Sequence, residues 1–398
     1  MNDLASILFW PVSGLILISI VITVHELGHY WVGRFFGAAV ESFSIGFGKP
    51  IFEKRDRRGT RWRINWMPLG GFVKFVGEIQ APTDTREPHE DETAPANSST
   101  KLVGKAYTEL GPLKRICVSL GGPFANFIFA IIAFAFMGYA FGVPQAKETS
   151  VSAVEAGGPA DVAGFKVGDV FVEAGGRTVT TVDDINKATV LNAGEEVSYK
   201  VRRDGEIITL VATPAERVET NEALNITEKV GRIGLGLQQR NMIMKGLNPI
   251  EAVGYGFTST GDAIGATVNV LRRLVTGKDG LDKLSGPIGI FSLADKVTDM
   301  HMKQPDIPLE RRIGDLLISW IQLAALLSIG VGFFNLLPIP VLDGGAVVMC
   351  AAEAVTGREI PEKVQQIGLT VGLVCLVSFA LLITWQDLTR SLPWLGGS

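Results

Sequence analysis

The stretch that decides the fold is Val-Ile-Thr-Val-His-Glu-Leu-Gly-His-Tyr, residues 21–30. His25 and His29 are four positions apart, so in a helix both imidazoles project from one face. Two imidazoles at this spacing can bind one Zn²⁺ and leave its other coordination positions open. Glu26 follows the first histidine, where its carboxylate can act as general base on a metal-bound water. The motif predicts a metal centre with Glu26 as candidate catalytic residue.

The residues before this motif, 4–24, are almost entirely apolar. Asp3 precedes the apolar run, no Lys or Arg does, and no A-x-A cleavage site follows, which argues against a signal peptide. We therefore predict that residues 1–35 form a first transmembrane helix carrying the zinc motif. An ionisable side chain at mid-membrane costs about 2.5–3.5 kcal/mol, and a metal would supply the missing partner. The alternative is a structural histidine pair packed in a polar bundle core.

The composition indicates a membrane protein, since 47% of the residues are hydrophobic and the mean hydropathy of +0.28 is high for a soluble protein. Crossing a bilayer takes about 20 residues. Four segments qualify: Leu4–Tyr30, Ile116–Phe141, Leu316–Asn335 and Ile367–Trp385. The net charge of −4 gives no basis for nucleic-acid binding. Cys117, Cys350 and Cys375 have no metal-type or disulfide spacing and read as small apolar residues.

Basic residues predict the orientation of the spans. They cluster in the loop after the first span and just before the second, at Arg34, Lys49, Lys54, Arg55, Arg57, Arg58, Arg61, Arg63, Lys74, Lys114 and Arg115. That loop should be cytoplasmic by the positive-inside rule. Both termini and the region between the second and third spans are then outside, in the periplasm if the cell is bacterial.

Residues 36–77 have strand character and predict a membrane-associated β-hairpin. Trp62, Ile64 and Trp66 alternate with polar residues, and Arg57–Gly59 is a plausible turn. An edge strand at Phe72, Val73, Lys74 and Phe75 could hold an extended substrate by strand addition. The alternative is a surface hairpin without a substrate role. Residues 78–105 are polar, aperiodic and contain His89, and are predicted to be a flexible cytoplasmic linker.

The second span, predicted at 106–143, contains Gly-Gly-Pro-Phe-Ala-Asn at 121–126. Small residues let helices approach closely, and Asn126 is a candidate support of the active site. Residues 147–238 follow, with short strand-like runs and Gly158-Pro-Ala-Asp ahead of Gly168-Asp. This pattern resembles a PDZ domain, which binds extended peptides by strand addition. The alternative is a compact domain that acts only as a size filter. Residues 246–313 predict amphipathic helices and a connecting loop, beginning with a capped start at Asn248.

The third span, predicted at 314–345, ends in Asn-Leu-Leu-Pro-Ile-Pro-Val-Leu-Asp-Gly-Gly, residues 335–345. Pro338 and Pro340 must interrupt the helix, and irregular backbone at membrane depth is tolerated where it lines a cavity. Asp343 is therefore the candidate third metal ligand, since catalytic zinc commonly takes three protein ligands and water. The alternative is that Asp343 caps the next helix. Residues 346–398 predict a fourth transmembrane helix and the C-terminus.

Together, His25-Glu26-x-x-His29 and Asn335-x-x-Pro-x-Pro-x-Leu-Asp343-Gly-Gly resemble the site-2 protease family of intramembrane zinc metalloproteases, and its bacterial RseP-like branch in particular. The resemblance implies an α-helical polytopic membrane protein with about four transmembrane helices, a membrane-associated β-hairpin and an inserted α+β PDZ-like domain. This chain shows one PDZ-like unit, whereas several relatives carry two.

By this resemblance, His25, His29 and Asp343 would bind one zinc ion and Glu26 would be the catalytic base. Asn335 could hydrogen-bond the exposed substrate backbone. The expected substrates are single-span membrane proteins cut first by another protease, such as anti-sigma factors, or remnant signal peptides. The expected location is the bacterial inner membrane, with the N-terminus and PDZ domain periplasmic and the active site towards the cytoplasm.

Two other functions fit parts of the sequence. A non-proteolytic membrane adaptor would capture envelope peptides through its PDZ domain and hold a structural zinc, but such a site usually has four protein ligands. An ion or zinc transporter would use the same histidines and aspartate, but the halves of the chain show no inverted repeat.

Overall fold

The computed structural model describes residues 3–78, 102–190, 192–221, 226–277, 287–303, 307–358 and 360–391. Most of the predicted linker, including His89, lies outside these ranges, as do residues 278–286 of the region predicted to hold a connecting loop. The chain forms two compact units: residues 1–133 with 284–398, and residues 134–283.

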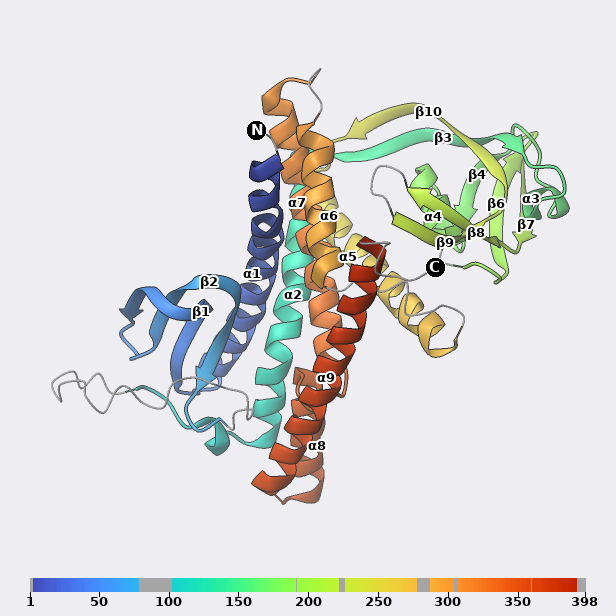
Figure 1. Cartoon of the computed structure of the whole chain (residues 1–398). Coiled ribbons are helices and arrows are strands. Elements are labelled where there is room, and N and C mark those ends of the chain that lie inside the picture. Colours follow the sequence, from blue (N-terminus) through green and yellow to red (C-terminus); the bar gives the residue numbers. More distant parts are fainter. Residues whose placement is uncertain are drawn as a thin grey trace. The chain divides into compact units, whose positions relative to one another are not determined.

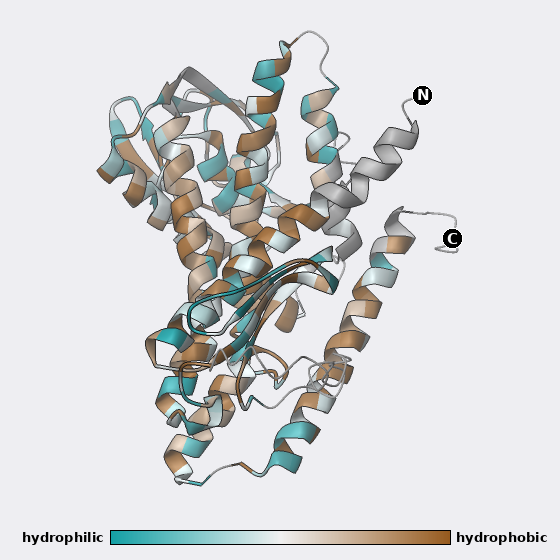
Figure 2. Ribbon diagram, turned by 90° about the vertical axis from the view of Figure 1, so that its left-hand side faces the viewer, coloured by the Kyte–Doolittle hydropathy of each residue, from teal (hydrophilic) through white to brown (hydrophobic). Residues whose placement is uncertain are grey.

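The first unit is built on apolar helices, which are drawn in Figure 1 and coloured largely as hydrophobic in Figure 2. They are α1 (Asp3–Phe35), α2 (Pro112–Ala140, its first part), α6 (Pro287–Met302), α7 (Leu309–Asn335), α8 (Asp343–Thr356) and α9 (Glu362–Ser391). Within the described residues, four helices have the length and composition to cross a membrane, over Gly14–Phe35, Pro112–Ala140, Leu309–Asn335 and Glu362–Gln386. This agrees with the number of spans expected from the sequence.

The structure differs from the sequence-based boundaries near the third span. α7 already begins at Leu309 and ends at Asn335, and Asp343 opens the separate helix α8. Residues 346–398, which were predicted to hold one transmembrane helix, therefore contain most of α8 and all of α9. α8 has 14 residues, too few to cross a bilayer alone, and stops at Gly357, which adopts the left-handed conformation that favours glycine.

Close approach of α1 and α2 depends on two glycines. A Cβ at Gly28 would collide with the carbonyl oxygen of Gly121, and a Cβ at Gly121 would lie 2.8 Å from the carbonyl oxygen of Gly28. The helix backbones can therefore touch where the histidines of α1 face α2. Nearer the N-terminus of α1, the side chain of Leu17 packs with those of Ala294 and Leu323. These residues join α1, α6 and α7 in one apolar cluster.

Strands β1 (Val40–Arg55) and β2 (Arg61–Phe75) form an antiparallel hairpin. Phe43 pairs with both Trp62 and Val73, so the first half of β1 lies between the two halves of β2. The hairpin packs on α1, where the Trp62 ring contacts the rings of Tyr30 and Phe43 at 5.1 and 4.7 Å between centroids. The segment Phe72–Phe75 is consequently a sheet edge beside the helix that carries the histidines.

The second unit contains a sheet in the order β10-β3-β4-β6-β7, with β5 paired to β4. Its elements are β3 (Val143–Val154), α3 (Pro159–Val162), β4 (Val170–Ala174), β5 (Arg177–Thr178), α4 (Val182–Val190), β6 (Val197–Arg203), β7 (Glu206–Ala212) and β10 (Leu235–Lys245). Strands β8 (Ala215–Asn221) and β9 (Ile226–Arg232) form a separate hairpin. The buried rings of Phe165, Phe171 and Tyr199 form the centre of the core of the second unit.

Helix α5 (Pro249–Val275) belongs to the second unit and starts as the sequence predicts. The Asn248 side chain accepts hydrogen bonds from the backbone N–H groups of Ile250 and Glu251, and Glu251 accepts one from Asn248 in return. This capping box is confirmed. Its other end is held by Arg273, which is buried and donates to the carbonyl oxygen of Ala193.

Candidate metal centre and active site

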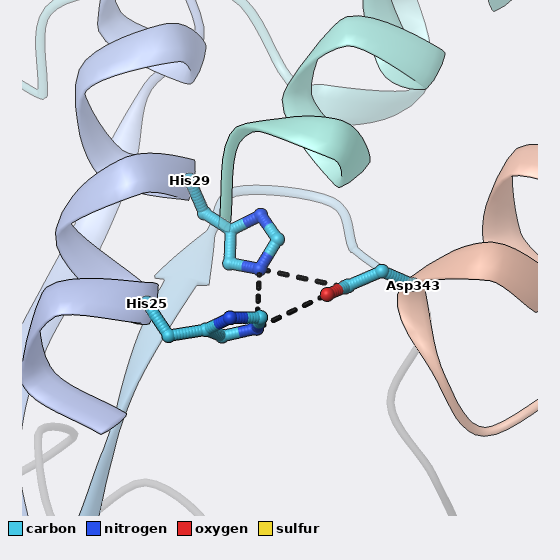
Figure 3. Close-up of side chains that lie close together, drawn as sticks. All are labelled: His25, His29 and Asp343. Atoms are coloured by element: carbon cyan, nitrogen blue, oxygen red, sulfur yellow. Dashed lines mark hydrogen bonds and ion pairs between the residues drawn. The ribbon is translucent and has the colours of Figure 1, made fainter. Parts of the chain in front are cut away.

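Both histidines of the motif are buried on one face of α1 (Figure 3). Their Nε2 atoms lie 3.1 Å apart. His29 Nδ1 donates to the carbonyl oxygen of Val118 on α2, over 2.8 Å. Because a carbonyl can only accept, this bond keeps the His29 proton on Nδ1 and leaves the Nε2 lone pair free for a metal.

Asp343 reaches the same point from α8 (Figure 3). Its carboxylate oxygens lie 3.0 Å from His25 Nε2 and 3.4 Å from His29 Nε2. The alternative that Asp343 serves as a helix cap is not observed, since Leu342 is the N-cap of α8 and makes no side-chain cap bond. The carboxylate is directed at the imidazoles instead.

Two glycines make this placement possible. A Cβ at Gly344 would collide with the carbonyl oxygens of Leu336 and Leu337, and one at Gly345 would collide with that of Ile339. The turn after α7 can therefore fold tightly against the start of α8. This contact brings Asp343 back to the depth of the histidines.

The donor groups are close enough to share one metal ion. Zinc bonds of about 2.0–2.1 Å to nitrogen and oxygen require neighbouring donors about 3.3–3.4 Å apart in a tetrahedron. His25 Nε2 lies 3.1 Å from His29 Nε2 and 3.0 Å from Asp343 Oδ2, and the other carboxylate oxygen, Oδ1, lies 3.4 Å from His29 Nε2. Among the described residues, His25, His29 and Asp343 are the group that could hold a metal ion. Three ligands leave a fourth position for water or substrate.

Glu26 lies beside this centre, in a cavity of about 470 Å³ that His25, His29 and Asp343 also line. Its Oε2 accepts a hydrogen bond of 2.9 Å from the backbone N–H of Val73 on β2. The glutamate predicted as base and the strand predicted to bind substrate are thus in direct contact.

Strand alternation separates the four β2 residues that were predicted to position substrate. Val73 and Phe75 line the cavity. Phe72 instead stacks on Phe47, with 6.1 Å between ring centroids, and Lys74 Nζ pairs with Glu41 at 3.0 Å. Val73 and Phe75 are therefore placed to contact a substrate in the cavity, whereas Phe72 and Lys74 contact other residues of the hairpin.

The two predicted asparagines occupy different positions. Asn335 lines the cavity, and its amide Nδ2 donates to the carbonyl oxygen of Val331 one turn earlier in α7. Asn126 is fully buried, and its Nδ2 lies 3.2 Å from His25 Nδ1. Asn335 can meet a ligand in the cavity, whereas Asn126 contacts the metal site from behind.

Sequence reasoning missed an ion pair in the cavity wall. Arg115 of α2 donates to Glu353 of α8 over 2.7 Å, and both side chains are largely buried. The available signal was Glu353 itself, which is the one acidic residue of α8 besides Asp343. Tyr107, at the 3-10 helix Tyr107–Glu109, also lines this wall, and burial raises the pKa of its hydroxyl so that it stays neutral.

Long apolar helices around a buried His-His-Asp set and a neighbouring glutamate define the class of membrane-bound metallohydrolases. Residues 13–379 match the model of Peptidase family M50, and this chain belongs to that family. It is 39% identical to the metalloprotease MmpA of Caulobacter vibrioides, over 95% of both chains.

Two further relatives are also named as zinc metalloproteases. Proteins named as candidate zinc metalloproteases in Mesorhizobium japonicum and Agrobacterium fabrum are 35% and 32% identical to this chain. The alignments cover 94% of this chain in both cases, and 97% and 94% of the relatives. The chain is a membrane protein and a metalloprotease, as its sequence predicts.

Gly122 of α2 provides a test of the site geometry. A Cβ there would lie 2.7 Å from His25 Cε1 and would collide with His29 Nε2. We expect Gly122→Ala to displace the imidazoles and to weaken Zn²⁺ affinity at least about tenfold, the scale of effect seen when the groups around metal ligands are disturbed. Chelator competition on the detergent-solubilised protein measures this affinity.

The matched control is Gly330→Ala on α7, where an added Cβ meets nothing within 4 Å. It should bind Zn²⁺ as the native protein does. Equal, native affinity in both alanine variants would contradict the site described above.

Proposed function

We propose that this protein is an intramembrane zinc metalloprotease that hydrolyses peptide bonds within the transmembrane segments of single-span membrane proteins. The observation that carries the proposal is that His25, His29, Asp343 and Glu26 line one cavity among helices with the properties of membrane spans. Zinc bound there would act as a Lewis acid on the substrate carbonyl and would promote ionisation of water.

The protein's own residues supply proton transfer and positioning. Glu26 takes a proton from the attacking water onto a carboxylate oxygen and returns it to the nitrogen of the leaving amine. His25, His29 and Asp343 would hold the metal. Because a helical carbonyl is hydrogen-bonded and shielded, the substrate must be extended near the scissile bond, and the edge of β2 is suited to hold it so.

Two carboxylates cap this edge. The N–H groups of Val73 and Phe75 both point away from β1, as alternate residues of a strand do, and donate to Glu26 Oε2 and Glu78 Oε2 over 2.9 and 3.2 Å. An extended substrate would offer its carbonyl oxygens to the same N–H groups. Its binding would place the chain against Glu26 and release that carboxylate from Val73.

Val73→Pro tests the role of the edge. Proline removes the N–H that faces away from β1, and outward positions of edge strands tolerate proline. We expect Zn²⁺ binding to persist and the KM for a single-span substrate to rise about tenfold, the loss of about 1.4 kcal/mol of substrate binding.

Val73→Ala is the control for this experiment, because it keeps the N–H and changes only the side chain. It measures any contribution of the Val73 side chain, which lines the cavity, and the further rise in KM for Val73→Pro then reports the lost N–H. Native cleavage by the folded, zinc-bound Val73→Pro protein would show that the strand does not hold substrate.

Water must reach a site that lies among apolar helices. Polar residues in the cavity wall offer a route: Glu78, Tyr107, Thr108, Arg115, Ser119, Glu353, Glu362 and Gln365. Several of them adjoin the basic loop that the positive-inside rule assigns to the cytoplasm. We therefore place the active site towards the cytoplasmic side of a bacterial inner membrane, with the N-terminus and the second unit in the periplasm.

The second unit offers a peptide site of the PDZ kind. A groove of about 610 Å³ lies between α4 and residues 233–237, and β10 is the terminal strand of its sheet. A terminal strand can accept another strand, and Ile185, Leu235 and Leu237 line the groove with apolar surface. An extended peptide segment of a membrane-protein substrate is the proposed occupant.

Asn186→Trp should fill this groove, since Asn186 lines it from α4. We expect fluorescein-labelled extended peptides with free C-termini to bind the variant at least tenfold more weakly, measured by fluorescence anisotropy. Asp183→Trp, at an exposed position of the same helix, is the matched control. If the native protein binds no peptide in the panel, or if Asn186→Trp binds as well, the groove is not a peptide site.

Glu26→Gln tests the catalytic proposal. The amide cannot accept the proton, so cleavage of a single-span model substrate by purified protein should fall at least about 100-fold. Zn²⁺ content should be unchanged, because Glu26 is not one of the three ligands. Glu41→Gln removes an acid that pairs with Arg61 and Lys74 and does not line the cavity, and it should cleave normally.

Anti-sigma factors already cut by another protease and remnant signal peptides are the proposed natural substrates. If native and Glu26→Gln proteins both bind Zn²⁺ and neither cuts a panel of helix-destabilised spans, the proposal that the substrates are transmembrane segments is refuted.

A further inference from the structure

Asn126 of α2 lies against His25, and one of its two amide atoms lacks a hydrogen-bond partner. Its side chain is fully buried between α1 and α7, with Nδ2 placed 3.2 Å from His25 Nδ1. Its other amide atom, Oδ1, is buried without a hydrogen-bond partner. A buried carbonyl oxygen without a donor costs about 1–3 kcal/mol, so this orientation of the amide needs an explanation.

The position of the ring proton on His25 decides which atom of the amide can face it. If the Asn126 amide nitrogen donates to His25 Nδ1, then Nδ1 holds a lone pair and the ring proton is on Nε2. His25 Nε2, however, is the atom that faces His29 Nε2 and Asp343 at 3.1 and 3.0 Å. A metal ligand at that position must be unprotonated, so the proton must be on Nδ1, which then requires an acceptor.

Rotating the amide by 180° resolves the conflict. The oxygen and nitrogen of an asparagine side chain are nearly equal in size and exchange places in this rotation. Oδ1 then lies against His25 Nδ1 and accepts its proton in a hydrogen bond. His25 Nε2 is then free to bind the metal, and the amide NH₂ takes the place that the oxygen occupied.

We propose that Asn126 is a positioning residue whose side-chain oxygen accepts from His25 Nδ1–H and fixes the ring in its metal-binding tautomer. Val118 does the same for His29 through its backbone oxygen. Both acceptors belong to α2, so this one helix orients both imidazoles of α1.

The surroundings of Asn126 hold it in place for this role. The Ser328 hydroxyl of α7 donates to the backbone oxygen of Asn126 over 3.1 Å. Gly332, one turn later, lets α7 approach closely, because a Cβ there would lie 3.1 Å from Asn126 Cβ. The inference rests on the proposed metal ligands, and its test is therefore one of metal binding rather than of cleavage.

Asn126→Asp and Asn126→Leu distinguish an acceptor from a donor. Aspartate keeps an oxygen acceptor and has no N–H, whereas leucine has neither and is of similar size. If Asn126 accepts from His25, Asn126→Asp should bind Zn²⁺ within about threefold of the native protein or more tightly. Asn126→Leu should lose about 10–100-fold, as is usual when the hydrogen-bond partner of a ligating histidine is removed.

Chelator competition on the full-length protein in detergent gives the affinities, and the absorption spectrum of bound Co²⁺ reports the coordination geometry. Equal weakening in both variants would overturn the proposal, because it would mean that the amide N–H is what His25 needs. Equal, native affinity in both would overturn it as well.

A measurement without substitution covers the case in which a variant does not fold. ¹⁵N NMR of the zinc-bound native protein should show His25 with the proton on Nδ1, and a proton on Nε2 would refute the inference. Failure of the proposed function looks different: the native protein would then bind no Zn²⁺, or would bind it and cut no substrate.

Discussion

The structure depends on the meeting of His25, His29 and Asp343, whose ligand atoms lie within 4.8 Å of one another. The histidines come from α1 and the aspartate from the start of α8 near the other end of the chain. Three such groups among apolar helices are costly to bury unless each has a partner. A metal ion shared by the three would satisfy all of them at once and would tie the first helix to the last part of the chain.

Helix α2 contacts the helices that carry these three residues and helps to align them. Its glycines at 121 and 122 let it touch α1 at the level of the imidazoles, where larger side chains would collide with backbone or rings. It also places acceptors behind the histidines, at Val118 and, in our proposal, at Asn126. Arg115 at its beginning pairs with Glu353 of α8, the helix that carries Asp343. α2 therefore contacts both elements that supply the ligands.

The hairpin adds a functional constraint to this scaffold. Its outward N–H groups at Val73 and Phe75 are bonded to Glu26 and Glu78, so the edge is covered by carboxylates rather than left open. Uncovered strand edges invite unselective pairing. In the proposed function, a substrate strand would have to replace these carboxylates, and its binding would thereby free the proposed base from Val73.

The sequence alone determined the elements that depend on local pattern. Spacing in His25-Glu26-x-x-His29 and apolar length predicted the metal-binding helix and the spans, and Asn248 with Glu251 predicted the start of α5. Near Asp343, local pattern predicted a break but not the separate helix α8, because proline only ends a helix and does not say where the chain turns next.

Tertiary structure decided what depends on contacts between distant segments. It divided the predicted substrate strand into cavity-lining Val73 and Phe75 and outward Phe72 and Lys74, and it paired Arg115 with Glu353. It also placed Asn126 behind His25, where its oxygen lacks a donor. Periodicity shows which face of an element a residue occupies. Only packing decides which neighbour that face meets, because the partner comes from elsewhere in the chain.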